Sequence, residues 1–267
     1  MDLDRHVAGF RAFADTHLNG EETNDYNIRL KREHSLNVLA NSRAIVQSED
    51  IAGRTGELAV LASLYHDIGR FPQFARFGTY KDADSMHHGR LGVLTLRKLS
   101  LPDDVSATEW RLIRAAVGLH NAKTVNPSIN GALRTLVDVV RDADKVDIFA
   151  VILDHLSVRD NSQGVVIHSL EEHPTRYTVP VYETIVSGTP CDYGSLRYSN
   201  DFILLLLGWL FSLSFLSSLD MLSRRGLVDK AFSLLPDDAR IKALEQKVHA
   251  LIHYKNQSPL ARTDLKP

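Results

Sequence analysis

The sequence predicts an all-α protein. Apolar residues recur at the three- and four-residue spacing of helices over most of the chain, as between Gly131 and Leu156. The run from Leu58 to Leu64 is apolar almost all round, which is typical of a helix buried on every side. One long segment, residues 160–200, loses the helical period. We therefore expect a compact helical bundle with one irregular segment.

The composition is that of an ordinary globular protein. Of 267 residues, 44% are hydrophobic and 24% charged, and the net charge is −2 with a sequence pI of 6.6. This length is enough to bury a core. Because there is no basic excess, we expect no nucleic-acid polymer as a partner. The single cysteine, Cys191, excludes an internal disulfide and a cysteine metal cage, which suits a reducing, cytoplasmic location.

Two segments bear on targeting and membranes. Residues 1–6 are acidic and polar, unlike a signal peptide. Residues 202–219 carry no charge over about 18 positions, which is near the lower limit for a membrane-spanning helix. They contain four serines and lie between Asp201 and Asp220 without a basic and aromatic belt. We therefore expect a buried core helix and no membrane contact.

The N-terminal part predicts three helices, separated first by a polar loop at residues 20–27. They span residues 3–17, Ile28 to Gln47 and Arg54 to Ile68. His34 lies near the start of the second helix, where a histidine is more often structural than a ligand. Gly69 is a natural stop for the third helix, because glycine accepts the left-handed conformation that closes helices.

The most informative residues are His66 and Asp67, which are neighbours at the end of the third helix. A carboxylate in the core is costly unless it has a partner. An arginine, a backbone donor or a metal ion would each serve, and the doublet alone does not choose among them. Neighbours on a helix point about 100° apart, so the two side chains can share a site only at the helix end.

The middle of the chain supplies further histidines and aspartates on helical patterns. Residues 71–82 predict an aromatic, basic loop, beside which Arg70 could contact an anion; the alternative is a solvated loop. A helix beginning near Ser85 carries His88, and another runs from Pro102 to His120. The helix between Gly131 and Leu156 carries four aspartates, Asp138, Asp142, Asp144 and Asp147. Aspartate is poor in helix interiors, so their density needs a reason.

The C-terminal part shows no chemical motif. Val165–Ile167 and Tyr177–Val181 favour extended chain, and a long loop of this kind is often functional. Three helical patterns follow, Asp201–Ser223, Gly226–Leu235 and Asp237–Tyr254. We expect residues 1–157 to form the helical core and residues 158–267 to form an extension packed on it as one structural unit, which could cover the pocket or support a homodimer.

The order His34, then His66–Asp67, then Asp144 resembles the HD-domain superfamily of metal-dependent phosphohydrolases. The resemblance runs from residue 34 to about 150 and includes four pieces: HDIGRF (66–71), HHGRLG (87–92), GLHN (118–121) and RDADKVD (141–147). A lone His-Asp doublet often occurs by chance, but four pieces in order are specific. The remainder, from about residue 155, is similar to the C-terminal part of some bacterial HD proteins.

The resemblance implies the fold, an HD-type helical bundle, and the metal ligands. His34, His66, Asp67 and Asp144 would hold one ion. His88 and His120 could hold a second, with Asp67 bridging; with a single ion they would instead contact phosphate or transfer protons. His88 fits the family spacing to Gly92, whereas His87 does not. Lys145 and Arg70 would bind substrate phosphate and, with Asp67, act in catalysis, while Asp142 and Asp147 make supporting bonds.

Imidazoles and carboxylates suit Mn, Fe, Co, Ni and Zn, and Mg with fewer imidazoles. We expect one or two such ions and a hydrolase that uses a metal-activated water on a phosphomonoester or phosphodiester, plausibly of a nucleotide. The partner would be a small-molecule phosphate ester. Two alternatives remain, an HD-type di-iron oxygenase and a non-catalytic sensor or scaffold. Residues 70–82 and 160–200 would set substrate choice.

Overall fold

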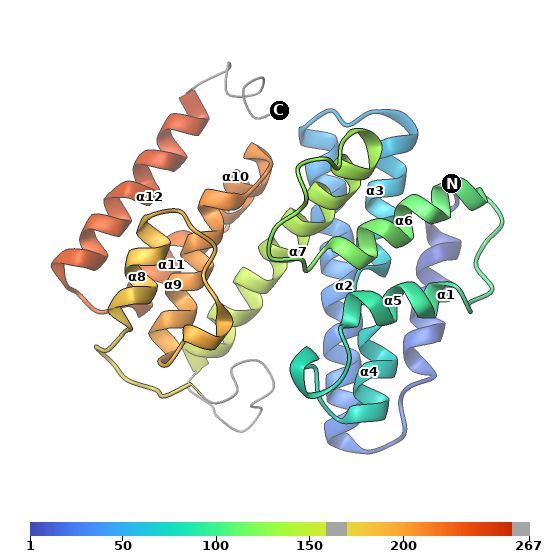
Figure 1. Ribbon diagram of the computed structural model, residues 1–267, viewed down its shortest axis with the longest axis horizontal. Coiled ribbons are helices and arrows are strands. Elements are labelled where there is room, and N and C mark those ends of the chain that lie inside the picture. The colour runs from blue at the N-terminus through green and yellow to red at the C-terminus, as the bar shows by residue number, and fades with distance from the viewer. Residues whose placement is uncertain (159–169, 258–267) are drawn as a thin grey trace. The chain divides into compact units, whose positions relative to one another are not determined.

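The computed structural model describes residues 1–158 and 170–257 (Figure 1). The prediction of an all-α fold is confirmed: the described residues form helices and loops, without a β-strand. The chain divides into two compact units, Met1–Asp147 and the part from Ile148 onward. All six candidate metal ligands belong to the first unit. The packing of the C-terminal extension on the core stays a prediction.

The first unit is built from seven helices of increasing distance along the chain. They are α1 (Leu3–Asp15), α2 (Glu22–Ser48), α3 (Gly53–Tyr65), α4 (Arg70–Phe77), the short η1 (Asp82–Asp84), α5 (His88–Leu96) and α6 (Ala107–Leu119), followed by the start of α7 (Gly131–Val158). Helix α3 packs against α1, α2 and α6. Every residue from Leu58 to Tyr65 is buried, which explains why this helix is apolar on all sides.

Helix α3 ends at Tyr65, three residues earlier than expected. His66 caps it with helical backbone angles, and Asp67 lies in the turn before α4. Gly69 is not left-handed, since its φ is −70°. Its role is close packing: a Cβ on Gly69 would lie 2.4 Å from the backbone nitrogen of Gly92 and 2.4 Å from the carbonyl oxygen of His88. The turn that carries Asp67 is therefore pressed against α5.

Residues 70–77 form helix α4, where the sequence suggested a loop. Phe71 and Phe74 are buried one turn apart on the same face. Pro72 is compatible with this helix because it lies in the first turn, where its missing N–H needs no partner. Gly78 ends the helix in the left-handed conformation, with φ 65°.

Other helix boundaries also differ from the expected ones, mostly at N-termini. Helix α2 begins six residues before Ile28, and α5 begins at His88 rather than near Ser85. Helix α6 begins at Ala107 rather than Pro102, because Ser106 and Glu109 form a capping box. These starts are set by side-chain caps and loop contacts, which an apolar pattern does not report.

The second unit is helical as well. It contains the end of α7, α8 (Val179–Val186), η3 (Tyr193–Ser195), α9 (Ser199–Trp209), η4 (Leu210–Ser212), α10 (Leu216–Arg224), α11 (Leu227–Leu234) and α12 (Ala239–Gln257). Helix α9 packs against α8 and α11, and α10 packs against α11 and α12. The extended segment predicted at Tyr177–Val181 is wrong, because α8 begins at Val179 with Pro180 in its first turn. Val165–Ile167 lie outside the described residues.

The apolar segment after Asp201 is a core element, but it is not one helix. Its first half, α9, is buried from Asn200 to Leu207. The backbone becomes extended at Leu213, which separates α9 and η4 from α10. Asp201 fixes the start of α9 by accepting hydrogen bonds from the backbone nitrogen and hydroxyl of Thr178 at 2.6 and 2.7 Å. Across residues 1–158 and 170–257, no helix has both the length and the apolar character that a membrane crossing requires.

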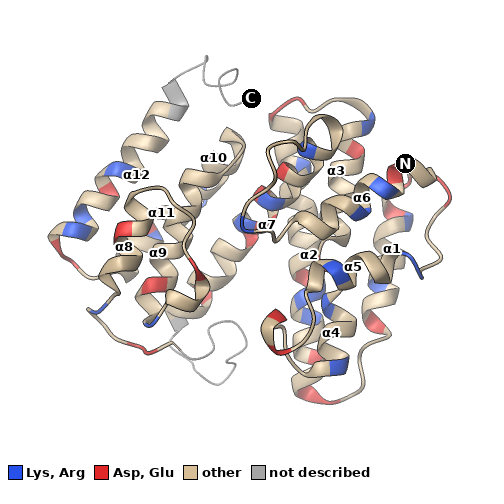
Figure 2. Ribbon diagram, viewed as in Figure 1, with Lys and Arg blue, Asp and Glu red and all other residues tan. Residues whose placement is uncertain are grey.

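Charged side chains of both signs are interspersed along the helices (Figure 2). Most printed pairs are at the surface, such as Arg134 with Asp138 and Arg224 with Asp220. Exposed pairs of this kind contribute little to stability. Lys31 differs from them, because its side chain is only 18% exposed and its partner, Asp67, is 3% exposed. This buried pair lies among the candidate metal ligands.

Candidate metal centre

The first unit brings the six candidate ligands together from five segments. His34 projects from α2, His66 caps α3, and Asp67 follows it in the turn. The other three are His88 at the start of α5, His120 directly after α6, and Asp144 on α7. All of them are buried except Asp144, whose side chain is 16% exposed.

Three of these side chains form one half of the centre, the His34 half. Nε2 of His34 lies 3.2 Å from Nε2 of His66 and 3.1 Å from Oδ1 of Asp144. Nε2 of His66 lies 3.5 Å from the same Asp144 oxygen. Asp67 contributes Oδ2, which is 3.6 Å from His34 and 3.7 Å from His66. Atoms bound at about 2.1 Å to one ion lie roughly 3–4 Å from each other, so this set fits one metal ion.

The second half, the His88 half, lies on the other oxygen of Asp67. Nε2 of His88 and Nε2 of His120 are 3.1 Å apart. Both lie 3.7 Å from Oδ1 of Asp67. The carboxylate of Asp67 therefore stands between two pairs of imidazoles and offers one oxygen to each pair.

Each histidine is held by its other ring nitrogen. Nδ1 of His66 lies 2.8 Å from the carbonyl oxygen of Ser63, and Nδ1 of His120 lies 2.7 Å from that of Val117. Because a carbonyl oxygen only accepts, the Nδ1 atoms carry the protons and donate them. Nδ1 of His34 and Nδ1 of His88 bond instead to carboxylates, as described below. In each neutral ring the Nε2 lone pair is thus directed into the centre.

Carboxylates support the remaining two histidines. Asp147 Oδ2 lies 2.6 Å from Nδ1 of His34, and Asp82 Oδ2 lies 2.7 Å from Nδ1 of His88. Carboxylate–histidine contacts of this kind are common around metal ions, where they fix the ring and raise its basicity. Asp147 was expected to make a supporting bond, whereas Asp82 was not singled out by its sequence.

The protonation states favour a bound cation. Burial, together with the imidazoles of His88 and His66, lowers the pKa of His120 to about 3. Burial also lowers the pKa of His88, against the opposing effect of Asp82. Both rings are therefore neutral at pH 7, and their Nε2 lone pairs face each other at 3.1 Å. Oδ1 of Asp67, between them, is buried and accepts no hydrogen bond from the described residues. A divalent ion would satisfy all three atoms.

The His34 half carries more protons. Burial and Lys31 lower the pKa of His34, but the carboxylates of Asp144 and Asp147 outweigh them and raise it to about 9. Burial raises the pKa of Asp144, yet the imidazoles of His34 and His66 hold it well below its usual range. An ion bound at this half must therefore displace a proton from His34.

Two predicted substrate-binding cations lie beside the centre. Nε of Arg70 is 3.5 Å from Oδ1 of Asp67, while its Nη1 donates to Gln73 Oε1 at 2.8 Å and to Asp82 Oδ1 at 3.2 Å. Part of this guanidinium is therefore committed to positioning η1. Lys145 follows Asp144 on α7, and burial lowers the pKa of its ammonium. His87 is exposed and accepts from the backbone nitrogen of Arg90, as the N-cap of α5.

Sequence reasoning missed Lys31, whose ammonium is 2.8 Å from Oδ2 of Asp67. Its signal was available, because Lys31 precedes His34 by three residues on one helix, and residues at that spacing share a face. The hydrogen-bonding carbonyls of Ser63 and Val117 carry no side-chain signal and could not have been found this way.

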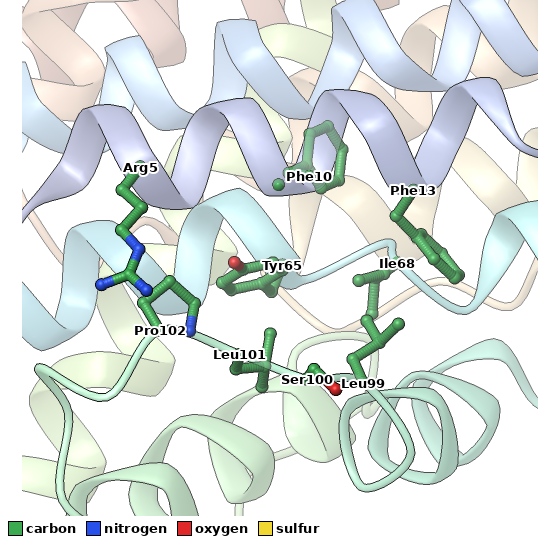
Figure 3. Close-up of a pocket in the computed structure, with 10 residues that line it drawn as sticks. Arg5, Phe10, Phe13, Tyr65, Ile68, Leu99, Ser100, Leu101 and Pro102 are labelled. Atoms are coloured by element: carbon green, nitrogen blue, oxygen red, sulfur yellow. The ribbon is translucent and has the colours of Figure 1, made fainter.

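A separate cavity lies elsewhere in the first unit (Figure 3). Its volume is about 340 Å³, and apolar side chains of α1, the end of α3 and residues 99–102 line it. Tyr65 and Ile68 reach it from positions that flank the doublet. None of the six candidate ligands lines this cavity, so the metal centre and the cavity are distinct.

A comparison with protein families matches the HD domain over residues 32–174. The chain belongs to the HD-domain family. This is a superfamily of metal-dependent hydrolases, typically phosphohydrolases, and the clusters His34–His66–Asp144 and His66–Asp67–His120 could each hold a metal ion. No curated protein and no solved structure matches the chain.

Proposed function

We propose that this HD-domain protein is a metal-dependent phosphohydrolase that cleaves a phosphomonoester or phosphodiester, with nucleotides as the first substrate class. The observation that carries the proposal is the placement of Asp67, whose two oxygens face two separate pairs of imidazoles at 3.6–3.7 Å. His34, His66, Asp67 and Asp144 would hold one ion, and His88 and His120, with Asp67, a second. Such ions lower the pKa of a bound water toward neutrality and polarise a phosphoryl oxygen.

The side chains of the centre are arranged for this role. The Nδ1 hydrogen bonds of the four histidines fix their rings, so little reorganisation is needed when charge develops in the transition state. Arg70 and Lys145 are the proposed substrate-phosphate ligands. Arg70 supports this with an Nε atom that is buried without a hydrogen bond to the described residues. If one ion suffices, His88 and His120 would contact phosphate or transfer protons instead.

A second candidate is a di-iron oxygenase of the HD type. The two-sided arrangement around Asp67 favours it as much as it favours a two-metal hydrolase, because imidazoles and carboxylates also suit iron. Its presence would be recognised by iron content and oxygen consumption rather than by phosphate release. A sensor or scaffold without catalysis is the third outcome.

The test is elemental analysis of the purified protein beside an assay on an aryl phosphate and a nucleotide panel. One or two metal ions per chain with phosphate release would support the hydrolase, and the count would assign the role of His88 and His120. Two irons with oxygen consumption and no phosphate release would support the oxygenase. Failure to bind any divalent ion after loading would overturn both.

A further inference from the structure

Lys31 makes a contact with the metal centre that its place in the sequence did not predict. Its ammonium lies 2.8 Å from Oδ2 of Asp67, and Asp67 is its one hydrogen-bonding partner among the described residues. The side chain is 18% exposed, more than that of any of the six candidate ligands. The ammonium thus has hydrogens to spare at the rim of a buried centre.

The oxygen that Lys31 occupies is the one that faces the His34 half. Oδ2 of Asp67 is 3.6 Å from His34 and 3.7 Å from His66, and it would be the carboxylate ligand of an ion held there. An ammonium and a divalent ion are both cations, so they repel each other and compete for this oxygen. Binding the ion must weaken the contact between Lys31 and Asp67.

The surroundings of Lys31 show where the ammonium can go. Its Nζ lies 5.6 Å from the centroid of the Tyr80 ring, and Cζ of Arg70 lies 5.7 Å from the same centroid. Tyr80 is fixed because its hydroxyl donates to the carbonyl oxygen of Asn27 on α2 at 2.8 Å. Two cations therefore converge on one held aromatic ring beside the centre. An anionic ligand at this place would be bound by both.

We propose that Lys31 couples metal loading to substrate binding. Its ammonium neutralises Asp67 until a divalent ion takes Oδ2, and it then binds an anionic oxygen of the phosphate ester beside Arg70. The anion half of this inference rests on the proposed function. The metal half does not, because it concerns only the competition for Asp67.

A merely structural role for Lys31 predicts the opposite effect on the metal. If Lys31 only held Asp67 in place, its removal would loosen the carboxylate and weaken metal binding. If the two cations compete, its removal strengthens metal binding. The sign of the change separates the two roles.

The experiment compares wild type with Lys31→Met, Lys31→Gln and Lys31→Arg, and with Lys98→Met as an exposed control. Chelator-treated protein is titrated calorimetrically with Mn²⁺, and the Mn²⁺-loaded protein with inorganic phosphate. Both neutral variants should bind Mn²⁺ about tenfold tighter and phosphate about tenfold weaker, the scale expected for one charge in contact. Lys31→Arg and Lys98→Met should resemble wild type in both titrations.

Weaker Mn²⁺ binding in the neutral variants, or unchanged phosphate binding, would overturn the proposal. So would a wild-type protein that binds no Mn²⁺. If both titrations change as expected but no phosphate ester is hydrolysed, the proposed function fails and the coupling stands. If esters are hydrolysed but the titrations do not change, the coupling fails alone.

Discussion

Oδ2 of Asp147 lies 2.6 Å from Nδ1 of His34, on the side of the ring opposite to Nε2, which faces Asp67 and Asp144. Asp147 and Asp144 are three residues apart on α7, so one helical face addresses both nitrogens of the same imidazole. The density of aspartates in α7 thus has a physical reason. Asp144 is a candidate ligand, and Asp147 orients its neighbour.

Removing the support should weaken the metal site without removing a ligand. We expect Asp147→Ala to lower metal affinity by about 10–100-fold, the usual effect of losing such a partner. Asp147→Asn keeps an acceptor for Nδ1 and should lose less. Asp138→Asn, on the same helix but paired with Arg134, is the matched control. Calorimetric metal titration measures all three, and an equal loss in the control variant would contradict the assignment.

The doublet should separate cleanly from the histidine that precedes His88. We expect His66→Ala and Asp67→Ala each to abolish metal occupancy and activity, because both side chains reach the centre. His87→Ala should retain both, since His87 is exposed and caps α5. Metal per chain, measured by elemental analysis after dialysis, is the readout. Equal losses in the three variants would reject the ligand set.

Much of the fold follows from the sequence, because buried faces impose a period. The all-round apolar α3 and the long α7 were predicted within a few residues at most ends. The ligand set came from spacing and from resemblance to the HD family, not from periodicity. What could not be predicted depends on tertiary contacts: Lys31 on Asp67, Asp82 on His88, and α4 in place of a loop. Each is fixed by a partner distant in the chain.

Gly69 illustrates a constraint that the sequence suggested for the wrong reason. Its backbone is not left-handed, but a Cβ there would lie 2.4 Å from two backbone atoms of α5. We expect Gly69→Ala to destabilise the protein by about 2–3 kcal/mol, because backbone cannot give way as a side chain does. Gly9→Ala is the control: it is in α1 with nothing within 4 Å of its Cβ, and should stabilise by about 0.5–1 kcal/mol. Urea unfolding measures both, and equal signs would refute the packing argument.

The start of α6 should make stability depend on acidic pH. Hydrogen bonds from Arg54 and from Ser106 lower the pKa of Glu109 to about 2, against an ordinary value of 4.5. A carboxyl whose folded pKa is depressed contributes stability above its unfolded pKa and loses it as the pH falls through the folded one. The contribution is therefore complete above about pH 4.5 and lost between there and about pH 2.

Glu109→Gln isolates this contribution, because the amide keeps an acceptor for the backbone nitrogen of Ser106 but loses the charge facing Arg54. We expect the urea midpoint of wild type to exceed that of the variant near pH 6, and the gap to close as the pH approaches 2. Arg54→Met should narrow the same gap at pH 6, since it removes the main cause of the shift. The groups are partly exposed, so added salt should reduce the gap. A gap that is constant from pH 6 to pH 2 would show that Glu109 acts through packing and not through its charge.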